Sequence, residues 1–448
     1  MISTENALDQ LADLIQRARR AGADAADGVL VEGISIGHAR RLDKIEKLER
    51  SEGYDLGLRV LIGKRQAIVS SNDRDADAMN ELVARAIAMA KVVPEDPYCG
   101  LADPDQIAKT WPADLDMVDP DEPAAEVLIE RARQAEEAAL GVAGVTNSEG
   151  GEANWGYSRV AIVASNGFAG GYAGSAHGVS VSVLAGSGDG MERDYDWAGA
   201  VYASDLEDPA TVGRRAGEKA VKRLGARKAQ TQKVPVIFDP RVATGMIGHL
   251  IGAITGPAIA RGTSFLKDKM GQAIFPEGIT IIDDPHRRRG QRSKPFDGEG
   301  LANKRRAIID KGVLTTWLLD LRSARQLGLQ STGHAARGTG GPPSPSATNL
   351  HMEPGSLTPA ALMADIAQGL YVTDLMGHGV NGVTGDYSRG ASGFWIENGQ
   401  IAWPVNEVTI AGNLKEMFLH LTAADDLVFR GATNAPTLRI DGMTVAGS

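Results

Sequence analysis

The segment that decides how this chain folds around its site is apolar and rich in glycine: Asp239-Pro240-Arg241-Val242-Ala243-Thr244-Gly245-Met246-Ile247-Gly248-His249-Leu250-Ile251-Gly252-Ala253. Large apolar residues recur in it at helical spacing, namely Val242, Met246, Ile247, Leu250, Ile251 and Ile254. Because this spacing places one side of a helix against a core, the pattern predicts a helix over residues 240–254.

The opposite side of this predicted helix carries four glycines, Gly245, Gly248, Gly252 and Gly256. A glycine within a helix costs up to about 1 kcal/mol relative to alanine, so four on one side need a reason. The favoured explanation is close packing of another backbone segment of the same domain. The alternative is close approach of a partner subunit or a peptide.

Helical and strand patterns on both sides of this segment indicate an α+β fold. Helices are expected over residues 4–22, 73–92, 122–139, 208–224, 358–370 and 414–422. Strands are expected over 28–39, 53–61, 66–70, much of 144–202, 234–238 and 371–410, with a terminal pair near 438 and 444. Residues 255–355 read as mostly loop. Apolar content drops between Lys222 and Lys233, which predicts a mixed α/β N-terminal domain (1–228) and a strand-rich C-terminal domain (229–448).

Composition excludes several classes of protein. The 448 residues carry a formal net charge of −10 with scattered cations, whereas a nucleic-acid partner would require a basic patch. No stretch approaches the roughly 20 apolar residues that cross a membrane. Cys99 is the single cysteine, so no internal disulfide can form, and a reducing, cytoplasmic location is expected.

Short motifs in the second half are specific in combination: Ala260–Phe265, Ile282–Pro285, Phe296–Gly300, Gly385–Gly393 and Ile396–Gly399. A looser match covers Gly53–Val60 and Pro94–Tyr98. Together they resemble the TldD/PmbA family. The resemblance implies the fold of that family and a role in a two-subunit zinc metalloprotease, in which one subunit type carries His-Glu-x-x-x-His on the helix quoted above.

The zinc motif of that family has no counterpart here. Laid on this helix, its first His falls on Gly248, its Glu on His249 and its second His on Ala253, and a register one residue earlier is equally empty. A later cysteine ligand of the zinc-bearing subunits falls in residues 427–433, which contain no cysteine. The resemblance therefore implies the PmbA (TldE)-type subunit, with no catalytic or metal residue in this chain and zinc held by a TldD-like partner.

Other candidate residues have simpler interpretations beside the functional one. His249 is interpreted as a hydrogen-bonded structural residue, Cys99 as an inert thiol, and residues 338–346 as a flexible loop. Two groups are candidates for contact with a partner or peptide: Gly245 and Gly252 on the helix, and Asp386, Tyr387, Ser388 and Arg389 within the glycine-rich strand region. For the second group an ordinary turn is an equal alternative.

Three functions are compatible with these observations. The leading hypothesis is a non-catalytic subunit that pairs with a TldD-like chain and presents peptides or unfolded protein to it. An autonomous peptidase centred on Cys99 or His249 is the second hypothesis. The third is a homodimeric peptide-binding protein, and a homodimer in the absence of the partner is also compatible with the first.

Overall fold

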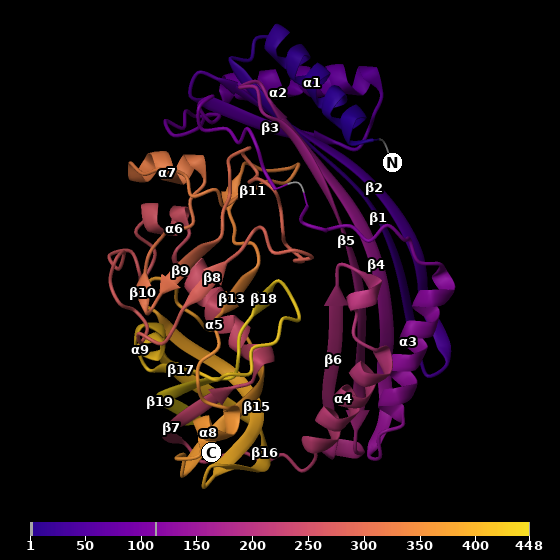
Figure 1. Ribbon diagram of the computed structural model, residues 1–448, viewed down its shortest axis with the longest axis vertical. Helices are drawn as coiled ribbons and strands as arrows, with labels where there is room; N and C mark the ends of the chain where they lie inside the picture. The colour runs from indigo at the N-terminus through magenta and orange to yellow at the C-terminus, as the bar shows by residue number, and fades with distance from the viewer. Residues whose placement is uncertain (1–2, 113, 448) are drawn as a thin grey trace.

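A curved sheet of six antiparallel strands dominates the first half of the protein (Figure 1). The computed structural model describes residues 3–112 and 114–447. The strands lie in the order β3-β2-β1-β4-β5-β6. Their bounds are β1 (Ala25–Arg41), β2 (Lys44–Ile62), β3 (Arg65–Ser71), β4 (Val145–Ala164), β5 (Ala169–Ala185) and β6 (Glu192–Ala200).

Four helices cover one face of this sheet: α1 (Thr4–Arg20), α2 (Ala76–Val92), α3 (Ala125–Leu140) and α4 (Pro209–Lys222). Side chains alternate along β1, so Leu30 packs with α1 and α2, whereas Val29 points to the opposite face and packs near Phe296 of the second half. Helix α1 lies so close to β1 that a methyl group on Gly28 would meet Leu11 Cδ2 at 2.8 Å. The helices thus bury one face and leave the other toward the C-terminal half.

Three further sheets and five α-helices build the described part of the second half, up to residue 447. The larger sheet has the order β16-β15-β14-β7-β19-β17, with β7 (Gln232–Phe238), β14 (Gln368–Met376), β15 (Asp386–Glu397), β16 (Gln400–Asn413), β17 (Leu421–Ala423) and β19 (Leu438–Ala446). The smaller has the order β10-β9-β8-β13-β18, with β8 (Ile281–Asp283), β9 (Arg306–Asp310), β10 (Val313–Leu314), β13 (Leu350–Met352) and β18 (Thr433–Asn434). Strands β11 (Ala335–Ala336) and β12 (Ser344–Pro345) pair separately. The helices are α5 (Pro240–Ala253), α6 (Gly256–Ala260), α7 (Leu321–Leu327), α8 (Pro359–Met363) and α9 (Leu414–Leu419).

The expected α+β fold and the helix of residues 240–254 are confirmed. Strand β1 contains its expected residues, but β2 begins at Lys44 rather than at residue 53. The prediction of a helix over 358–370 is wrong after Met363, where α8 ends. Residues from Gln368 onward belong to β14, which pairs in parallel with β7. The terminal strand pair is one strand, β19, with a register irregularity between Ile440 and Met443. Residues 421–422 belong to β17 rather than to a helix, and the region expected to be loop contains β8 to β13. The predicted boundary at 228/229 lies in the connection between α4 and β7.

A buried charge cluster joins the two halves near α1 and α2. Asp27 on β1 receives Arg59 Nε at 3.0 Å, and Arg337 of the second half places an amino nitrogen 2.5 Å from the same carboxylate. All three side chains are buried. Burial alone would raise the pKa of Asp27, but the charges of Arg337 and Arg59 lower it from 3.8 to about 2. Beside this cluster Thr339, within the loop expected to be flexible, docks its hydroxyl on Asp55.

Within the described residues, no helix is both long enough and apolar enough to cross a membrane.

Replacing Asp27 with Asn should lower the free energy of unfolding at neutral pH by about 3–5 kcal/mol, because two buried guanidinium groups lose their counter-charge. In the wild type, the lowered pKa means that the ionised carboxylate contributes about 2 kcal/mol above its ordinary pKa of 3.8, and that this is lost as the pH falls toward 2. Urea unfolding across that pH range measures both effects. Asp43→Asn, at an exposed partner of Arg40, is the control and should change stability by less than about 1 kcal/mol. An equal loss in both variants would contradict the role given to Asp27.

Candidate functional site

Helix α5 follows β7. Its first turn determines where it begins, and its apolar side determines which face packs against the core. The Asp239 carboxylate accepts a hydrogen bond from the Arg241 backbone at 3.1 Å, and Pro240 occupies the first turn, where no backbone donor is needed. The side facing the core carries Ala243, Met246, Ile247, Leu250 and Ala253, all buried. This packing fixes which side of α5 remains open.

The glycines of α5 face open space. A methyl group on Gly245, Gly248 or Gly252 would meet no other atom within 4 Å, and Gly248 and Gly252 are exposed. Close packing within the domain is therefore the wrong explanation for these three residues. Gly256, at the start of α6, is closely packed, but against side chains rather than a backbone: a methyl group there would lie 2.2 Å from Ser323 Oγ.

His249 packs against Tyr387, which lies on β15. The two rings meet edge to face with their centroids 5.7 Å apart. Among the described residues His249 Nε2 has no hydrogen-bond partner. The expectation that His249 is a hydrogen-bonded structural residue is therefore wrong for this nitrogen. Burial lowers the pKa of His249, and the charge of Arg389 lowers it further, which favours the neutral imidazole. This contact brings α5 together with residues 386–389, the two segments that the sequence offered separately as candidates for contact with a partner or peptide.

Residues 386–389 form the start of β15 rather than a turn. Asp386 and Ser388 are exposed, and Asp386 accepts hydrogen bonds from Thr384 Oγ1 at 2.6 Å and Asn413 Nδ2 at 3.0 Å. Tyr387 points the other way and is only 1% exposed, because side chains alternate along a strand. It is therefore unavailable on the surface. Partner or peptide contact by Asp386, Ser388 and the half-buried Arg389 stays a prediction.

The positions of the zinc motif do not fit a metal ion. Gly248 and Ala253 have no donor atom, and the single imidazole of His249 is engaged with Tyr387. Across residues 3–112 and 114–447, no three His, Cys, Asp or Glu side chains are grouped so that they could hold a metal. A zinc site of the usual kind needs three or four such ligands.

A cavity of about 770 Å³ lies beside the first turn of α5, where the two halves of the protein meet. Its walls come from β6, from Pro240, Arg241 and Thr244 of α5, and from residues 426–435. The structure thus brings the segment that would carry the cysteine ligand next to the helix that would carry the histidines. The cavity was not expected, because its lining comes from five separate parts of the chain, including Arg215 and Lys219 of α4 and Tyr371 of β14.

Ion pairs hold the walls of this cavity together. Arg241 binds Asp194 of β6 through two hydrogen bonds, at 2.6 and 3.1 Å, and donates a third to the Thr373 carbonyl oxygen. Arg430 reaches Asp196, the next acidic residue of β6, at 3.3 Å. Burial would raise the pKa of Asp194, but the hydrogen bond and charge of Arg241 outweigh it and leave the pKa below its ordinary value. Asp194 is therefore ionised and holds Arg241 of α5 against β6.

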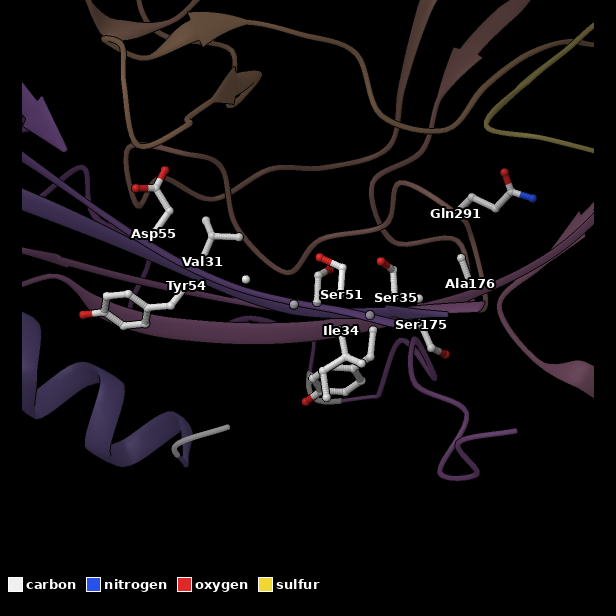
Figure 2. A pocket seen from close by; sticks show the side chains of 15 residues that line it. Val31, Ile34, Ser35, Ser51, Tyr54, Asp55, Ser175, Ala176 and Gln291 are labelled. Atoms are coloured by element: carbon white, nitrogen blue, oxygen red, sulfur yellow. The ribbon is translucent and has the colours of Figure 1, made fainter. Parts of the chain in front are cut away.

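A second cavity, of about 620 Å³, lies along the sheet face that the helices leave free. Its floor consists largely of small residues in register across the strands: Gly33 lies opposite Gly53 and Ser158, and Ser35 lies opposite Ser51 and Gly156. Figure 2 shows Ser35 and Ser51 on the side of the sheet that faces the loop carrying Gln291. In the sequence, this floor corresponds to glycine and serine at every second position of β1 and β2.

Cys99 is buried and only 4% exposed. Burial raises the pKa of its thiol, and the nearby Asp96 raises it further. A reactive cysteine needs the opposite shift, because the thiolate is the nucleophile. This environment supports the interpretation of Cys99 as an inert thiol.

Replacing Gly248 or Gly252 with alanine should raise the free energy of unfolding by about 0.5–1 kcal/mol each, because the methyl group meets nothing while alanine favours the helix. Gly256→Ala is the matched comparison and should lower it, because Ser323 must move. Urea unfolding of the three variants measures the differences. A destabilised Gly248→Ala protein would show that this side of α5 is covered.

Replacing Asp194 with alanine should cost about 3–5 kcal/mol of stability, because Arg241 loses a buried partner. Glu149→Ala, which breaks the exposed pair with Arg193, is the control and should cost less than about 1 kcal/mol. Urea unfolding compares the two. Similar small losses would mean that the Asp194–Arg241 pair does not hold the cavity wall.

Comparison with known proteins places this arrangement in a family. Residues 26–90, 118–224 and 231–447 match, in that order, domain 1, the central domain and the C-terminal domain of the PmbA/TldA metallopeptidases. The metalloprotease PmbA of Escherichia coli O157:H7 is 39% identical over 95% of this chain and 93% of its own length. A PmbA homologue of Haemophilus influenzae is 38% identical over 97% and 94%.

Two crystal structures share the fold over nearly their whole length. A Bacteroides thetaiotaomicron protein described as a modulator of DNA gyrase has a TM-score of 0.92 at 27% identity, with both chains fully covered. TldE of Thermococcus kodakarensis has a TM-score of 0.87 at 21% identity, over 98% of this chain and all of its own. With three domain matches in order and full-length relatives, this chain belongs to the PmbA/TldD family of metallopeptidases.

Proposed function

We propose that this chain is the non-catalytic subunit of a two-subunit zinc metalloprotease. The observation that carries the proposal is the state of α5, which is intact as a helix but has Gly248, His249 and Ala253 at the motif positions. Gly248 and Ala253 have no donor atom for a metal, and the position of the motif glutamate, which would act as general base on a zinc-bound water, is taken by the ring-packed His249. Hydrolysis would then depend on a TldD-like partner that supplies both the zinc and its ligands.

The role of this subunit is to shape the chamber and present peptides or unfolded protein. Two features support it. The open side of α5, with Gly248 and Gly252 exposed, leaves room for another backbone to approach closely. The small residues along the free sheet face line a cavity of about 620 Å³, and they offer few side chains that would select the sequence of an extended chain. A cytoplasmic location belongs to the same proposal, since Cys99 is the single cysteine.

The relatives named metalloprotease are compatible with this division of labour, because a family name covers catalytic and non-catalytic members alike. An autonomous peptidase would need a nucleophile or a metal. The buried Cys99 and the neutral, ring-packed His249 give it neither.

Mixing the purified chain with a zinc-bearing TldD-like subunit should give a stable complex that contains zinc and cleaves unstructured peptides. The chain alone should contain no stoichiometric zinc and should not cleave. Metal analysis, size-exclusion chromatography and a fluorogenic peptide assay measure these outcomes. The control is the same mixture with a partner whose motif glutamate is replaced by glutamine, which should assemble without cleaving.

A variant pair tests whether the open side of α5 takes part. Gly248→Leu together with Gly252→Leu should preserve folding but reduce assembly or peptide turnover by at least about tenfold, a change of about 1.4 kcal/mol. Gly278→Leu, at another exposed glycine with open space, is the matched control and should leave both unchanged. Chelator-sensitive cleavage by the chain alone would reject the proposed function.

A further inference from the structure

A third cavity, of about 520 Å³, lies between helix α4 of the first half and the larger sheet of the second half. Lys219 and Lys222 of α4 line one side, and residues of β14, β15 and β16 line the other. Arg241 lines this cavity as well as the one beside α5, so the two adjoin at that side chain. The volume falls in the range of roughly 300–1,000 Å³ that is usual for sites of small organic ligands.

The sheet side of this cavity is a flat apolar wall. Tyr371 of β14 lies opposite Phe394 of β15, and Phe394 lies opposite Pro404 of β16, so three ring side chains form a row across three strands. Neighbouring strands are about 4.8 Å apart, so the row is about 10 Å long. Ile401, which is 49% exposed, extends it. All three rings are only half-buried, so this apolar surface is not fully covered.

Helix α8 and the turn after it cover the neighbouring part of the same sheet face. Leu362 and Ile366 pack there on Ile237 and Ile396. Ile396 lies two residues after Phe394, and therefore on the same face of β15. The fold thus covers one part of this face with its own side chains and leaves the row of rings facing the cavity.

The carboxylates that line the cavity already have partners. Asp194 receives two hydrogen bonds from Arg241, at 2.6 and 3.1 Å. Asp239 caps α5 with one oxygen, and its other oxygen accepts a hydrogen bond from the Tyr371 hydroxyl at 3.0 Å. Neither carboxylate is left to bind a cationic ligand.

The lysine side of the cavity has a positive charge to spare. Lys219 and Lys222 are three residues apart on α4, so they project from the same side of the helix. Lys219 binds Asp196 at 3.3 Å. Lys222 is exposed and forms no ion pair or hydrogen bond with any residue of 3–112 or 114–447. An ammonium group of this kind pairs well with a carboxylate, which both neutralises it and accepts its hydrogen bonds.

We propose that this cavity binds a small molecule with a flat aromatic body and a single carboxylate. The aromatic body lies against Tyr371 and Phe394, where ring-to-ring contact adds to the burial of apolar surface. The carboxylate faces Lys222. One negative charge is sufficient, because the other charged side chains around the cavity are paired. Two sources supply this chemistry, namely a free aromatic acid and the C-terminal aromatic residue of a peptide.

A simpler interpretation is that the rings only shield the sheet and that Lys222 is a solvated surface lysine. Under that interpretation aromatic compounds would bind weakly, and their charge would not matter. The two interpretations therefore differ in whether binding requires the ring and the carboxylate together, and in whether it requires Lys222.

Calorimetric titration of the full chain, without a protease partner, tests the ligand. Naphthoate should bind with one molecule per chain, and naphthamide, which has the same rings without the charge, should bind at least about tenfold more weakly. Acetate should not compete with naphthoate, because it has no ring to lie on the wall. A short alanine peptide that ends in phenylalanine, with a free or an amidated C-terminus, represents the second source. The tighter of the two free acids identifies the source.

Variants test the position of the site. Lys222→Gln should weaken naphthoate binding at least about tenfold and leave naphthamide unchanged, so that the two compounds then bind alike. Lys228→Gln is the matched control, because Lys228 is also exposed but pairs with Glu407 and does not line the cavity. Phe394→Ala should weaken both compounds, since it removes the central ring of the wall, and urea unfolding verifies that this variant is folded.

Three results would overturn the site: no binding of either free acid at about 1 mM, equal affinity for naphthoate and naphthamide, or equal effects of Lys222→Gln and Lys228→Gln. The inference does not rest on the proposed function, because binding is measured on the chain alone. Failure of the titration would leave assembly with a zinc-bearing partner untouched, and failure of assembly would leave the titration untouched.

Discussion

The ion pair between Arg241 and Asp194 is the constraint on which the site depends. It fixes the first turn of α5 to β6, and the third bond of Arg241 reaches the backbone of β14. One side chain thus links the helix, the first-half sheet and the larger second-half sheet. A buried pair of this kind contributes little net stability, but its geometry is demanding, so it positions the helix more than it strengthens the fold. The cavity beside α5 exists because these three elements are held in this relation.

Patterns with local causes were readable from the sequence. The apolar repeat of α5 predicted its bounds to within a residue, and the runs in β1 and β5 predicted these two strands. The first nine residues of β2, 44–52, were missed, because most of them are charged and apolar residues do not alternate there. The short strands β8 to β13 were missed, because two to five residues are too few to show a period. Residues 368–370 were wrongly assigned to a helix, since pairing with β7 decides their conformation.

The candidate site shows a further limit. Gly248 and Gly256 are alike in sequence, but one faces open space and the other touches Ser323, and only the tertiary structure separates them. Tyr387 sits among exposed polar neighbours, yet the phase of β15 turns it inward onto His249. The sequence predicted the presence or absence of metal ligands better than it predicted the positions of residues in space. The absence of ligands at positions 248 and 253 is plain in the sequence, whereas the two cavities required the fold.

The Asp27 cluster has a mechanical consequence when it is considered together with Asp194. Asp27 lies opposite Ala164 at the end of β4, whereas Asp194 lies opposite Val183, which is paired near the beginning of β4. Arg337 and Arg241 therefore fasten the second half at opposite ends of the curved sheet. Because the sheet is bound to the second half at both of its ends, neither end is free to move away by itself. Separating the two halves therefore requires both buried ion pairs to break.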